Sequence, residues 1–315
     1  MRALRLVPDK TTFRFMRWRT FNFTASIAAT ILSLVLVAVM GLNFGIDFRG
    51  GTLIEIQTKD GPADIAQIRE LVGDLGLGDV QIQEFGAPND VLIRVEEQDG
   101  GELAQQAVIE KVKAALGDGV EYRRVEIVGP QVSGELVQSG VIAVLSALFA
   151  ILIYIWFRFE WQYAIGAVVS TSHDVVLTLG LFAAIRYEFN LSSIAAVLTI
   201  VGYSLNDTVV VYDRIRDNLR RYKKMPIAEV IDLSVNDMLS RTVNTSLTTL
   251  LALFALYIFG GEVIRGFAFA MIWGVIVGTY SSTFIGAPIL IFLNLRPGTG
   301  KDGGEETAEA AAATS

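Results

Sequence analysis

Residues 189–212 read FNLSSIAAVLTIVGYSLNDTVVVY, an apolar stretch with a single charged residue, Asp207. About 20 apolar residues are enough to cross the hydrocarbon core of a bilayer, so this stretch predicts a transmembrane helix. A charge at bilayer depth costs ~2.5–3.5 kcal/mol on insertion scales and usually faces a partner or a water path. Asp207 is therefore a candidate for ion or proton coupling. The structural alternative is an Asp that only holds helices together through hydrogen bonds.

The composition places the whole chain in the membrane class. Hydrophobic residues make up 52% of its 315 residues and charged residues 19%, which indicates an integral membrane protein. Six stretches between flanking charges are long enough to span a bilayer. These predicted spans are 20–46, 136–157, 161–185, 189–212, 242–261 and 266–295. The first span is too long for a cleaved signal peptide, and no A-x-A site follows it.

Basic residues in the connecting segments predict the orientation. The N-terminal arm, residues 1–19, and the loop predicted over residues 213–241 are both rich in Lys and Arg. Short basic segments stay in the cytoplasm, so six spans place both termini there. Residues 296–315 consist largely of Gly, Glu, Ala and Thr without an apolar period. We expect them to form a disordered cytoplasmic tail.

The long segment between the first two spans, residues 47–135, predicts one extracytoplasmic domain. It contains 18 acidic and 8 basic residues, a net charge of −10, which disfavours nucleic acid as a partner. Its apolar periods give the element order βαββαβ. The expected strands are 53–57, 80–83, 91–95 and 122–128, the helices 64–75 and 103–116, and a turn covers 86–90. This order predicts a ferredoxin-like sandwich of α+β class.

Several chemical classes have no support in the sequence. The chain has no cysteine, which excludes disulfides and thiol metal sites. It also lacks the G-x-x-x-x-G-K-[ST] motif of nucleotide binding. No nucleophile–base pairing or metal cluster is evident, so we expect no enzymatic activity, no cofactor and no metal. A gradient or a partner would have to supply the energy for any work.

The fourth span carries a polar stripe that includes Asn206 and Asp207, because residues three and four apart share a helix face. The stripe ends near Asp213 and Arg214, at the cytoplasmic end of the helix. Arg241, one residue before the fifth span, is a candidate counter-charge. The apolar pattern within residues 231–239 favours a helix that extends inward, which would place Arg241 deeper than the charge-bounded span implies. We expect Asp207 and Arg241 to pair when the acid is ionised and to separate when it is protonated. The alternative is an Arg241 side chain that reaches the lipid headgroups.

The third span holds His173 and Asp174, and His173 is the one histidine of the chain. The two residues predict either a second station for protons or a neutral His hydrogen-bonded across helices. Adjacent residues point about 100° apart on a helix, so the two side chains are not expected to line one narrow path equally. Metal binding is disfavoured because further ligands are missing.

Two longer motifs carry a resemblance to a known family. GIDFRGGT, residues 45–52, which includes Gly45, Asp47, Gly50 and Gly51, resembles the opening motif of the SecD/SecF family of translocase proteins. VGYSLNDTVVVYDRIRDN, residues 201–218, resembles the fourth-helix signature of the SecF branch, and residues 240–249 resemble its fifth helix. The external segment is short, which favours the SecF branch, because SecD proteins carry a much larger external domain.

The resemblance implies a multi-pass protein of the bacterial inner membrane. It implies six helices that form half of an RND-like twelve-helix unit, with SecD as the other half. It further implies the SecYEG channel, YajC, the exported polypeptide and membrane lipids as partners, and use of the proton-motive force late in protein export. Asp207 and Arg241 would then be a proton-relay pair. The competing interpretations are an RND-like exporter of lipids or small molecules and a passive stabilising subunit.

Overall fold

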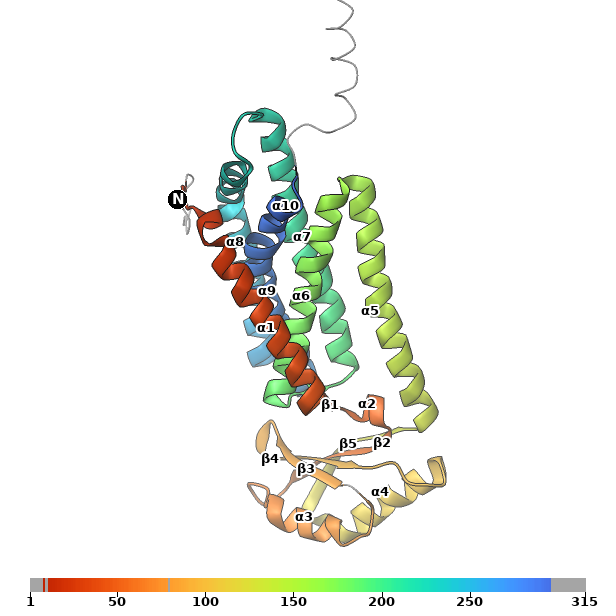
Figure 1. Ribbon diagram of the computed structural model, residues 1–315. Helices are drawn as coiled ribbons and strands as arrows, with labels where there is room; N and C mark the ends of the chain where they lie inside the picture. Colours follow the sequence, from red (N-terminus) through yellow and green to blue (C-terminus); the bar gives the residue numbers. More distant parts are fainter. Residues whose placement is uncertain (1–7, 9–10, 79, 296–315) are drawn as a thin grey trace, which may run out of the picture.

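The computed structural model describes residues 8, 11–78 and 80–295, and it contains a helical bundle with one external domain at its end (Figure 1). Six helical segments in this described part are long and apolar enough to cross a membrane. They are built from α1 (Arg19–Met40), α5 (Pro130–Arg158), α6 (Trp161–Ile185), α7 (Leu191–Arg221), α8 (Ile227–Phe259) and α9 (Glu262–Ser281). The predicted class, a six-helix membrane protein, is confirmed. The predicted tail, 296–315, and residues 1–7, 9 and 10 of the basic arm lie outside the described residues.

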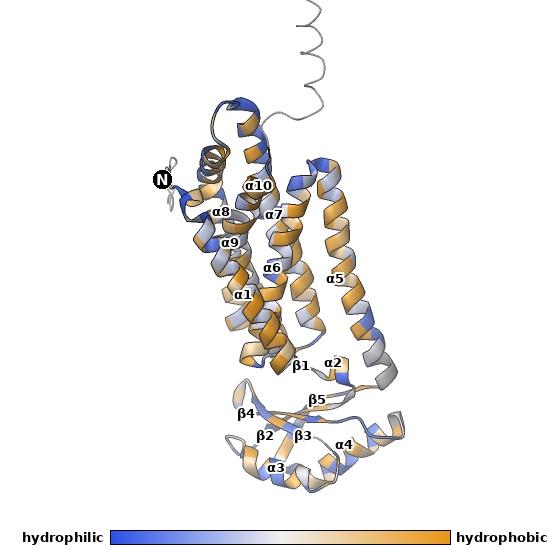
Figure 2. Cartoon of the chain, in the orientation of Figure 1, coloured by the Kyte–Doolittle hydropathy of each residue, from blue (hydrophilic) through white to orange (hydrophobic). Residues whose placement is uncertain are grey.

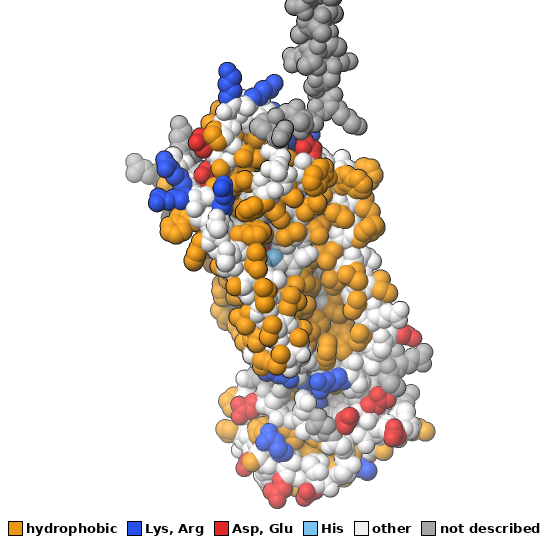
Figure 3. Space-filling model, viewed as in Figure 1, with side chains coloured by type: hydrophobic (Ala, Val, Ile, Leu, Met, Phe, Trp, Pro, Cys, Tyr) orange, Lys and Arg blue, Asp and Glu red, His pale blue; other side chains and the backbone are white. Residues whose placement is uncertain are grey.

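Apolar side chains form a band around the bundle. In Figure 2 hydrophobic residues dominate the middle of the helices, and hydrophilic residues gather at the ends of α7 and α8 that face away from the external domain. The space-filling view has the same band, with basic side chains at both of its borders (Figure 3). This distribution is what a bilayer requires, because a charged side chain is tolerated only at or beyond the headgroups or against a partner.

The helical boundaries differ from the charge-bounded spans at the far end of the bundle. Residues 213–241 were predicted as a basic loop, but α7 continues to Arg221 and α8 begins at Ile227. Lys, Arg and Glu are good helix formers, so a run of charges ends the apolar stretch without ending the helix. The actual connection is residues 222–226, which close with Pro226 at the N-cap of α8.

The last span is not a uniform α-helix. After α9, residues Ser282–Gly286 form one π-helical turn, and α10 (Ala287–Phe292) completes the span. Pro288 lies at the start of α10. Proline removes a backbone hydrogen bond and clashes with the preceding turn, and π-helical turns are often found at functional sites.

The external domain has the predicted ferredoxin-like order. Its elements are β2 (Gly51–Thr58), α3 (Ile65–Gly73), β3 (Val80–Phe85), β4 (Ala87–Val95), α4 (Glu102–Leu116) and β5 (Val120–Val128). The sheet order is β3-β4-β2-β5, and every pairing is antiparallel. Helices α3 and α4 cover the face of the sheet that points away from the bundle (Figure 1). The predicted turn at 86–90 is wrong, because β4 already begins at Ala87 and the reversal takes place at Gly86, which has a φ of 86°.

A short junction joins the external domain to the bundle. The two-residue strand β1 (Asn43–Phe44) pairs in parallel with β6 (Glu188–Phe189), which lies between α6 and α7. The short helix α2 (Ile46–Arg49) follows β1. The aromatic rings of Phe44, Phe48 and Phe189 pack together at this point, with centroids 5.8 to 6.0 Å apart. The junction therefore ties the domain directly to the start of α7.

Candidate polar site in the helical bundle

Two acidic side chains lie inside the bundle, Asp174 on α6 and Asp207 on α7. Asp174 is fully buried, and Asp207 is partly buried. An ionised carboxylate in such surroundings is stable only when it is paired or hydrogen-bonded. The arrangement of donors around the two groups therefore defines what this site can do.

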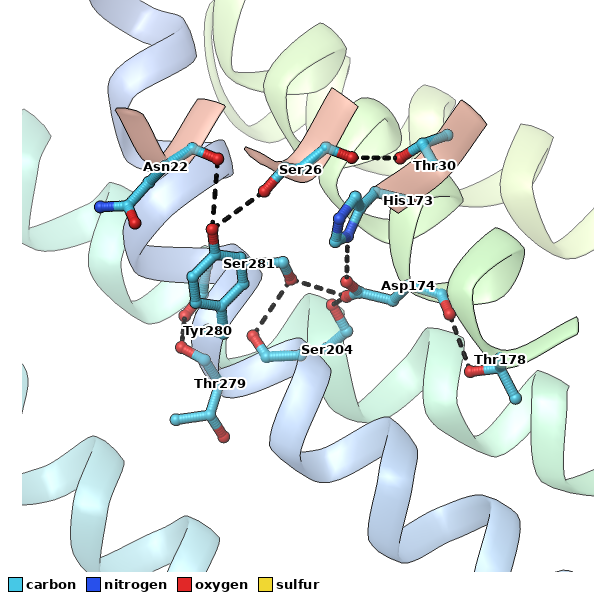
Figure 4. Close-up of polar contacts among 12 residues, drawn as sticks. Asn22, Ser26, Thr30, His173, Asp174, Thr178, Ser204, Thr279, Tyr280 and Ser281 are labelled. Carbon is cyan, nitrogen blue, oxygen red and sulfur yellow. Dashed lines mark hydrogen bonds and ion pairs between the residues drawn. The ribbon is translucent and has the colours of Figure 1, made fainter. Parts of the chain in front are cut away.

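Hydroxyl groups from two other helices surround Asp174 (Figure 4). Ser204 of α7 and Ser281 of α9 both donate to Asp174 Oδ2, at 2.5 Å and 2.7 Å. His173 Nδ1 lies 3.0 Å from Oδ1 of the same carboxylate. The side chains of these adjacent residues therefore contact each other (Figure 4), and whether both line one proton path stays a prediction.

Asp207 has a similar pair of donors. Thr242 of α8 donates to Oδ1 at 2.8 Å, and Ser282 donates to Oδ2 at 2.6 Å. Ser282 directly follows Ser281, so the two carboxylates bond to consecutive residues at the end of α9. Four helices therefore meet in one polar cluster, which comprises Asp174, Asp207, His173, Ser204, Ser281, Ser282 and Thr242.

Arg241 forms no ion pair with Asp207 in this conformation, and their pairing on ionisation stays a prediction. Among the ion pairs of the described residues, none joins Arg241 to Asp207. Arg241 is exposed, while the next residue, Thr242, is buried and makes the contact to Asp207. Successive helical residues point about 100° apart, so α8 can present only one of the two toward α7. The predicted contact is absent from this conformation.

Arg241 is instead one of several exposed polar residues on α7 and α8. We call this set the polar stripe, and its members are Thr199, Asn206, Arg241, Thr245 and Thr248. Asn206, a predicted site residue, thus points away from the polar cluster. Because α8 begins at Ile227, Arg241 lies well inside the helix rather than at its end.

Asp213 and Arg214 fasten the far part of α7 to its neighbours. The guanidinium of Arg214 bonds to Asp237 of α8 through Nε at 2.9 Å and Nη2 at 2.7 Å. Asp213 lies 3.8 Å from Arg158 at the end of α5, and both of these side chains are about half exposed. The contacts hold helix ends together and lie apart from the polar cluster.

The glycine motif forms the junction between the domain and the bundle. Asp47 Oδ2 accepts a hydrogen bond of 2.9 Å from the backbone N–H of Leu191, the first residue of α7. Gly50 and Gly51 have φ values of 74° and 113°, which glycine adopts readily and other residues rarely do. A Cβ on Gly51 would also collide with the carbonyl oxygen of Val95. The motif thus fixes the chain where it passes from the membrane into the sheet.

Sequence reasoning missed an ion pair at the same junction. Arg94 of β4 is buried, and its guanidinium pairs with Glu188 of β6. Burial and the neighbouring Arg49 lower the pKa of Arg94 to about 10, while Asp47 acts in the opposite direction. Arg94 therefore keeps its charge at neutral pH. No sequence signal links residues so far apart in the chain.

The hydroxyl donors of the cluster were also missed, although one signal was available. Tyr280, Ser281, Ser282 and Thr283 form a polar run within an otherwise apolar span. Such a run at bilayer depth favours contact with other polar groups. Within the described residues no group of three or more His, Cys, Asp or Glu could hold a metal ion. What remains is a site of two carboxylates and hydroxyls, which can bind and release a proton or a small cation.

Comparison with known families gives two matches within this chain. Residues 108–296 match the family described as protein export membrane protein SecD/SecF, C-terminal, and residues 35–61 match the SecD/SecF GG motif. A protein translocase subunit SecF from Rhodobacter capsulatus is 48% identical over 307 residues, covering 93% of this chain and 92% of the relative. A subunit SecF from Rickettsia akari is 47% identical over 291 residues, 91% of this chain and 94% of the relative.

Fused relatives and a solved structure match as well. A protein translocase subunit SecDF from Brucella abortus is 46% identical over 94% of this chain, which spans 39% of the relative. The crystal structure of SecDF from Thermus thermophilus, a translocon-associated membrane protein, superposes with a TM-score of 0.83 at 33% identity. That match covers 92% of this chain but only 40% of the solved chain. The chain thus spans about two fifths of the length of these longer proteins.

Proposed function

The chain belongs to the SecD/SecF family of protein export membrane proteins, and we propose that it couples an ion gradient to a late step of protein export. In this proposal it is the SecF-type subunit, it works beside a SecD-type subunit, and protons are the coupling ions. The observation that carries the proposal is the polar cluster. The carboxylate of Asp174 accepts a hydrogen bond from Ser281, and that of Asp207 accepts one from the next residue, Ser282. Acidic residues inside a membrane are by default candidates for ion pathways.

Protonation of Asp207 would act on the helices through its hydrogen bonds. The ionised carboxylate only accepts, and it holds Thr242 of α8 and Ser282 next to α9 as donors. A protonated carboxyl becomes a donor itself, so one of the two hydroxyls must change from donor to acceptor. Ser282 can do so because its own hydrogen can bond the carbonyl of Thr279 at 3.1 Å. Arg241, one position from Thr242, would approach Asp207 when a rotation or shift of α8 exchanges the two. Such a change biases a two-state helix arrangement, which is how a proton can drive movement.

The fused relatives support SecD as the partner. In SecDF proteins the region matched by this chain is one part of a single longer chain. The polar stripe supports the same proposal, because exposed Asn206 and Arg241 need a covering partner at bilayer depth. With SecD, the chain would complete an RND-like unit beside the SecYEG channel and YajC. The external domain would hold or release the exported polypeptide.

The remaining parts of the proposal concern location and chemistry. We place the protein in the bacterial inner membrane, surrounded by membrane lipids, with both termini in the cytoplasm as the basic segments indicate. It would perform transport work without enzymatic catalysis, cofactor or nucleic acid.

A passive stabilising role is the second candidate, and one observation favours it. Both oxygens of Asp207 already have hydroxyl donors, which is what an acid that merely holds helices together requires. The test must therefore separate proton binding from hydrogen bonding. Asn keeps the size and an acceptor oxygen of Asp but cannot take up a proton in the same way.

The deciding experiment is export of a secretory preprotein into membrane vesicles, with and without a proton gradient, using the Asp207→Asn variant together with SecD. We expect normal assembly and a loss of about tenfold or more in the gradient-stimulated part of export. Asp217→Asn is the matched control, because Asp217 lies on the same helix but is exposed. Gradient stimulation that survives in Asp207→Asn would favour the passive role.

A further inference from the structure

Two hydroxyls beside the polar cluster lack a protein partner. Ser170 of α6 and Thr208 of α7 are fully buried, and neither hydroxyl has a hydrogen-bond partner among the described protein groups. Other threonines of the bundle donate to the carbonyl four residues earlier, as Thr178 and Thr199 do at 2.8 Å and 2.7 Å. Ser170 and Thr208 do not use this common solution. Buried hydroxyls are normally satisfied by protein or by ordered water.

Ser170 and Thr208 both lie on the side of the polar cluster that is remote from the external domain. Ser170 precedes Asp174 by one helical turn, and Thr208 follows Ser204, a donor to Asp174, by one turn. At 1.5 Å per residue each lies roughly 6 Å from its cluster neighbour along the helix. Because α6 and α7 are antiparallel, both shifts point away from the external domain.

Ser170 and Thr208 both lie against the π-helical turn at Gly286, Ser170 through its hydroxyl and Thr208 through its methyl group. A Cβ on Gly286 would lie 3.3 Å from Tyr212 Oη, 3.5 Å from Thr208 Cγ2 and 3.6 Å from Ser170 Oγ. Tyr212 Oη itself donates to the carbonyl of Gly286 at 2.9 Å. Gly286 therefore carries no side chain at the point where Ser170, Thr208 and Tyr212 come together.

We propose that Ser170 and Thr208 bind an internal water next to Gly286, which extends the Asp174 cluster to Tyr212. Buried waters usually make about three hydrogen bonds to otherwise unsatisfied polar groups. Here Ser170, Thr208 and the hydroxyl of Tyr212 supply the partners. The role of this water rests on the proposed function: it gives a proton on Asp174 a route toward the end of the bundle remote from the external domain.

Labelling with hydroxyl radicals generated by X-rays from water tests the site directly. Tyr212 is fully buried, so label on its ring requires water held inside the bundle. We expect label on Tyr212 of the purified protein and none on Phe182, which is also buried but lies near the external domain. The absence of label on Tyr212 would overturn the water site.

Gly286→Ala should displace the water without disturbing the helix. Gly286 has φ −58° and ψ −50°, which alanine adopts without strain, and the added methyl would contact Ser170, Thr208 and Tyr212. We expect the label on Tyr212 to fall severalfold in Gly286→Ala and in Thr208→Val. Thr178→Val is the control, because that hydroxyl is already satisfied by its own helix. Unchanged label in both test variants would contradict the assignment.

Gradient-driven export then tests the role of the water separately. Thr208→Val should lower gradient-stimulated export severalfold, and Thr178→Val should not. Loss of label with fully retained export would overturn the proton route while the water site stands. Normal gradient-stimulated export by the Asp207→Asn variant would refute the proposed function. The labelling of Tyr212, and with it the water site, would not be affected by that result.

Discussion

Asp174 and Asp207 differ in the burial of their side chains. Asp174 is fully buried among three helices, whereas Asp207 is partly buried beside the polar stripe. Both use hydroxyl donors in place of a cation. Hydrogen bonds to charged groups contribute ~1.5–3 kcal/mol each, so single hydroxyls in this cluster should have measurable effects.

Thr242→Val removes one donor of Asp207 with little change of shape. We expect a loss of about 1–3 kcal/mol in the free energy of unfolding, together with weaker gradient-stimulated export. Thermal unfolding of the purified protein and the vesicle assay measure the two effects. Thr249→Val is the matched control, since Thr249 donates only to the carbonyl of Thr245 on its own helix. If both variants lost the same free energy of unfolding and the same amount of export, the hydrogen bond to Asp207 would contribute no more than an ordinary bond within one helix.

The ion pair of Arg94 and Glu188 allows a second prediction at the residue scale. Removing one partner of a fully buried ion pair costs ~3–5 kcal/mol, and Glu188 retains 22% side-chain exposure. We therefore expect Glu188→Gln to cost about 2–3 kcal/mol and to speed hydrogen exchange in β4. The double variant Arg94→Met with Glu188→Gln should recover part of the loss, because no unpaired charge remains. A double variant worse than both single variants would rule out this explanation.

At the scale of elements, the start of α7 depends on a residue outside the helix. Asp47 accepts from the N–H of Leu191, one of the donors that a helix start leaves without an intrahelical partner. Asn190 and Ser193 form a capping box at the same end. The helix that carries Asp207 is therefore held at its first turn by the glycine motif, and movement of α7 must act on the external domain at this point.

Asp47→Ala should loosen that end of α7. Loss of a capping acceptor costs ~1 kcal/mol, which corresponds to roughly fivefold faster hydrogen exchange at residues 190–193. Asp64→Ala is the control, because Asp64 accepts from Ala66 and Gln67 at the start of α3 inside the external domain. That variant should speed exchange at α3 only. Unchanged exchange at residues 190–193 in Asp47→Ala would mean that the capping box alone holds the helix start.

The elements show what a sequence pattern can and cannot predict. The apolar periods predicted the six-helix class and the βαββαβ order, because long amphipathic or apolar segments carry a strong signal. The pairing of β1 with β6 was not predictable, since two-residue strands have no period. The loop over 213–241 was wrong because charge bounds a membrane span, not a helix. In the site, the carboxylates were evident as charges in apolar spans, whereas their hydroxyl donors depend on which helices meet.

At the scale of the whole molecule, some of the exposed residues on the bundle are polar where lipid contact requires apolar ones. The outward sides of α1 and α5 expose large apolar residues such as Val39 and Phe149, as lipid contact requires. Helices α7 and α8 expose the polar stripe, beside apolar residues such as Leu251 and Phe254. Polar groups at this depth are stable only when they are buried in protein or line a water-filled path. This face is therefore where a second subunit should bind.

Site-specific photocrosslinking tests this surface. Benzoylphenylalanine in place of Asn206, in cells that also produce SecD, should give a SecD adduct at least fivefold stronger than the same probe in place of Val141. Val141 of α5 is 55% exposed and lies on an apolar face, so the control probe should react with lipid. Because Arg241 lies on the same stripe, Arg241→Ala should weaken the Asn206 adduct. A SecD adduct from residue 141 with none from residue 206 would place the partner on the opposite side and leave the stripe to line a water path.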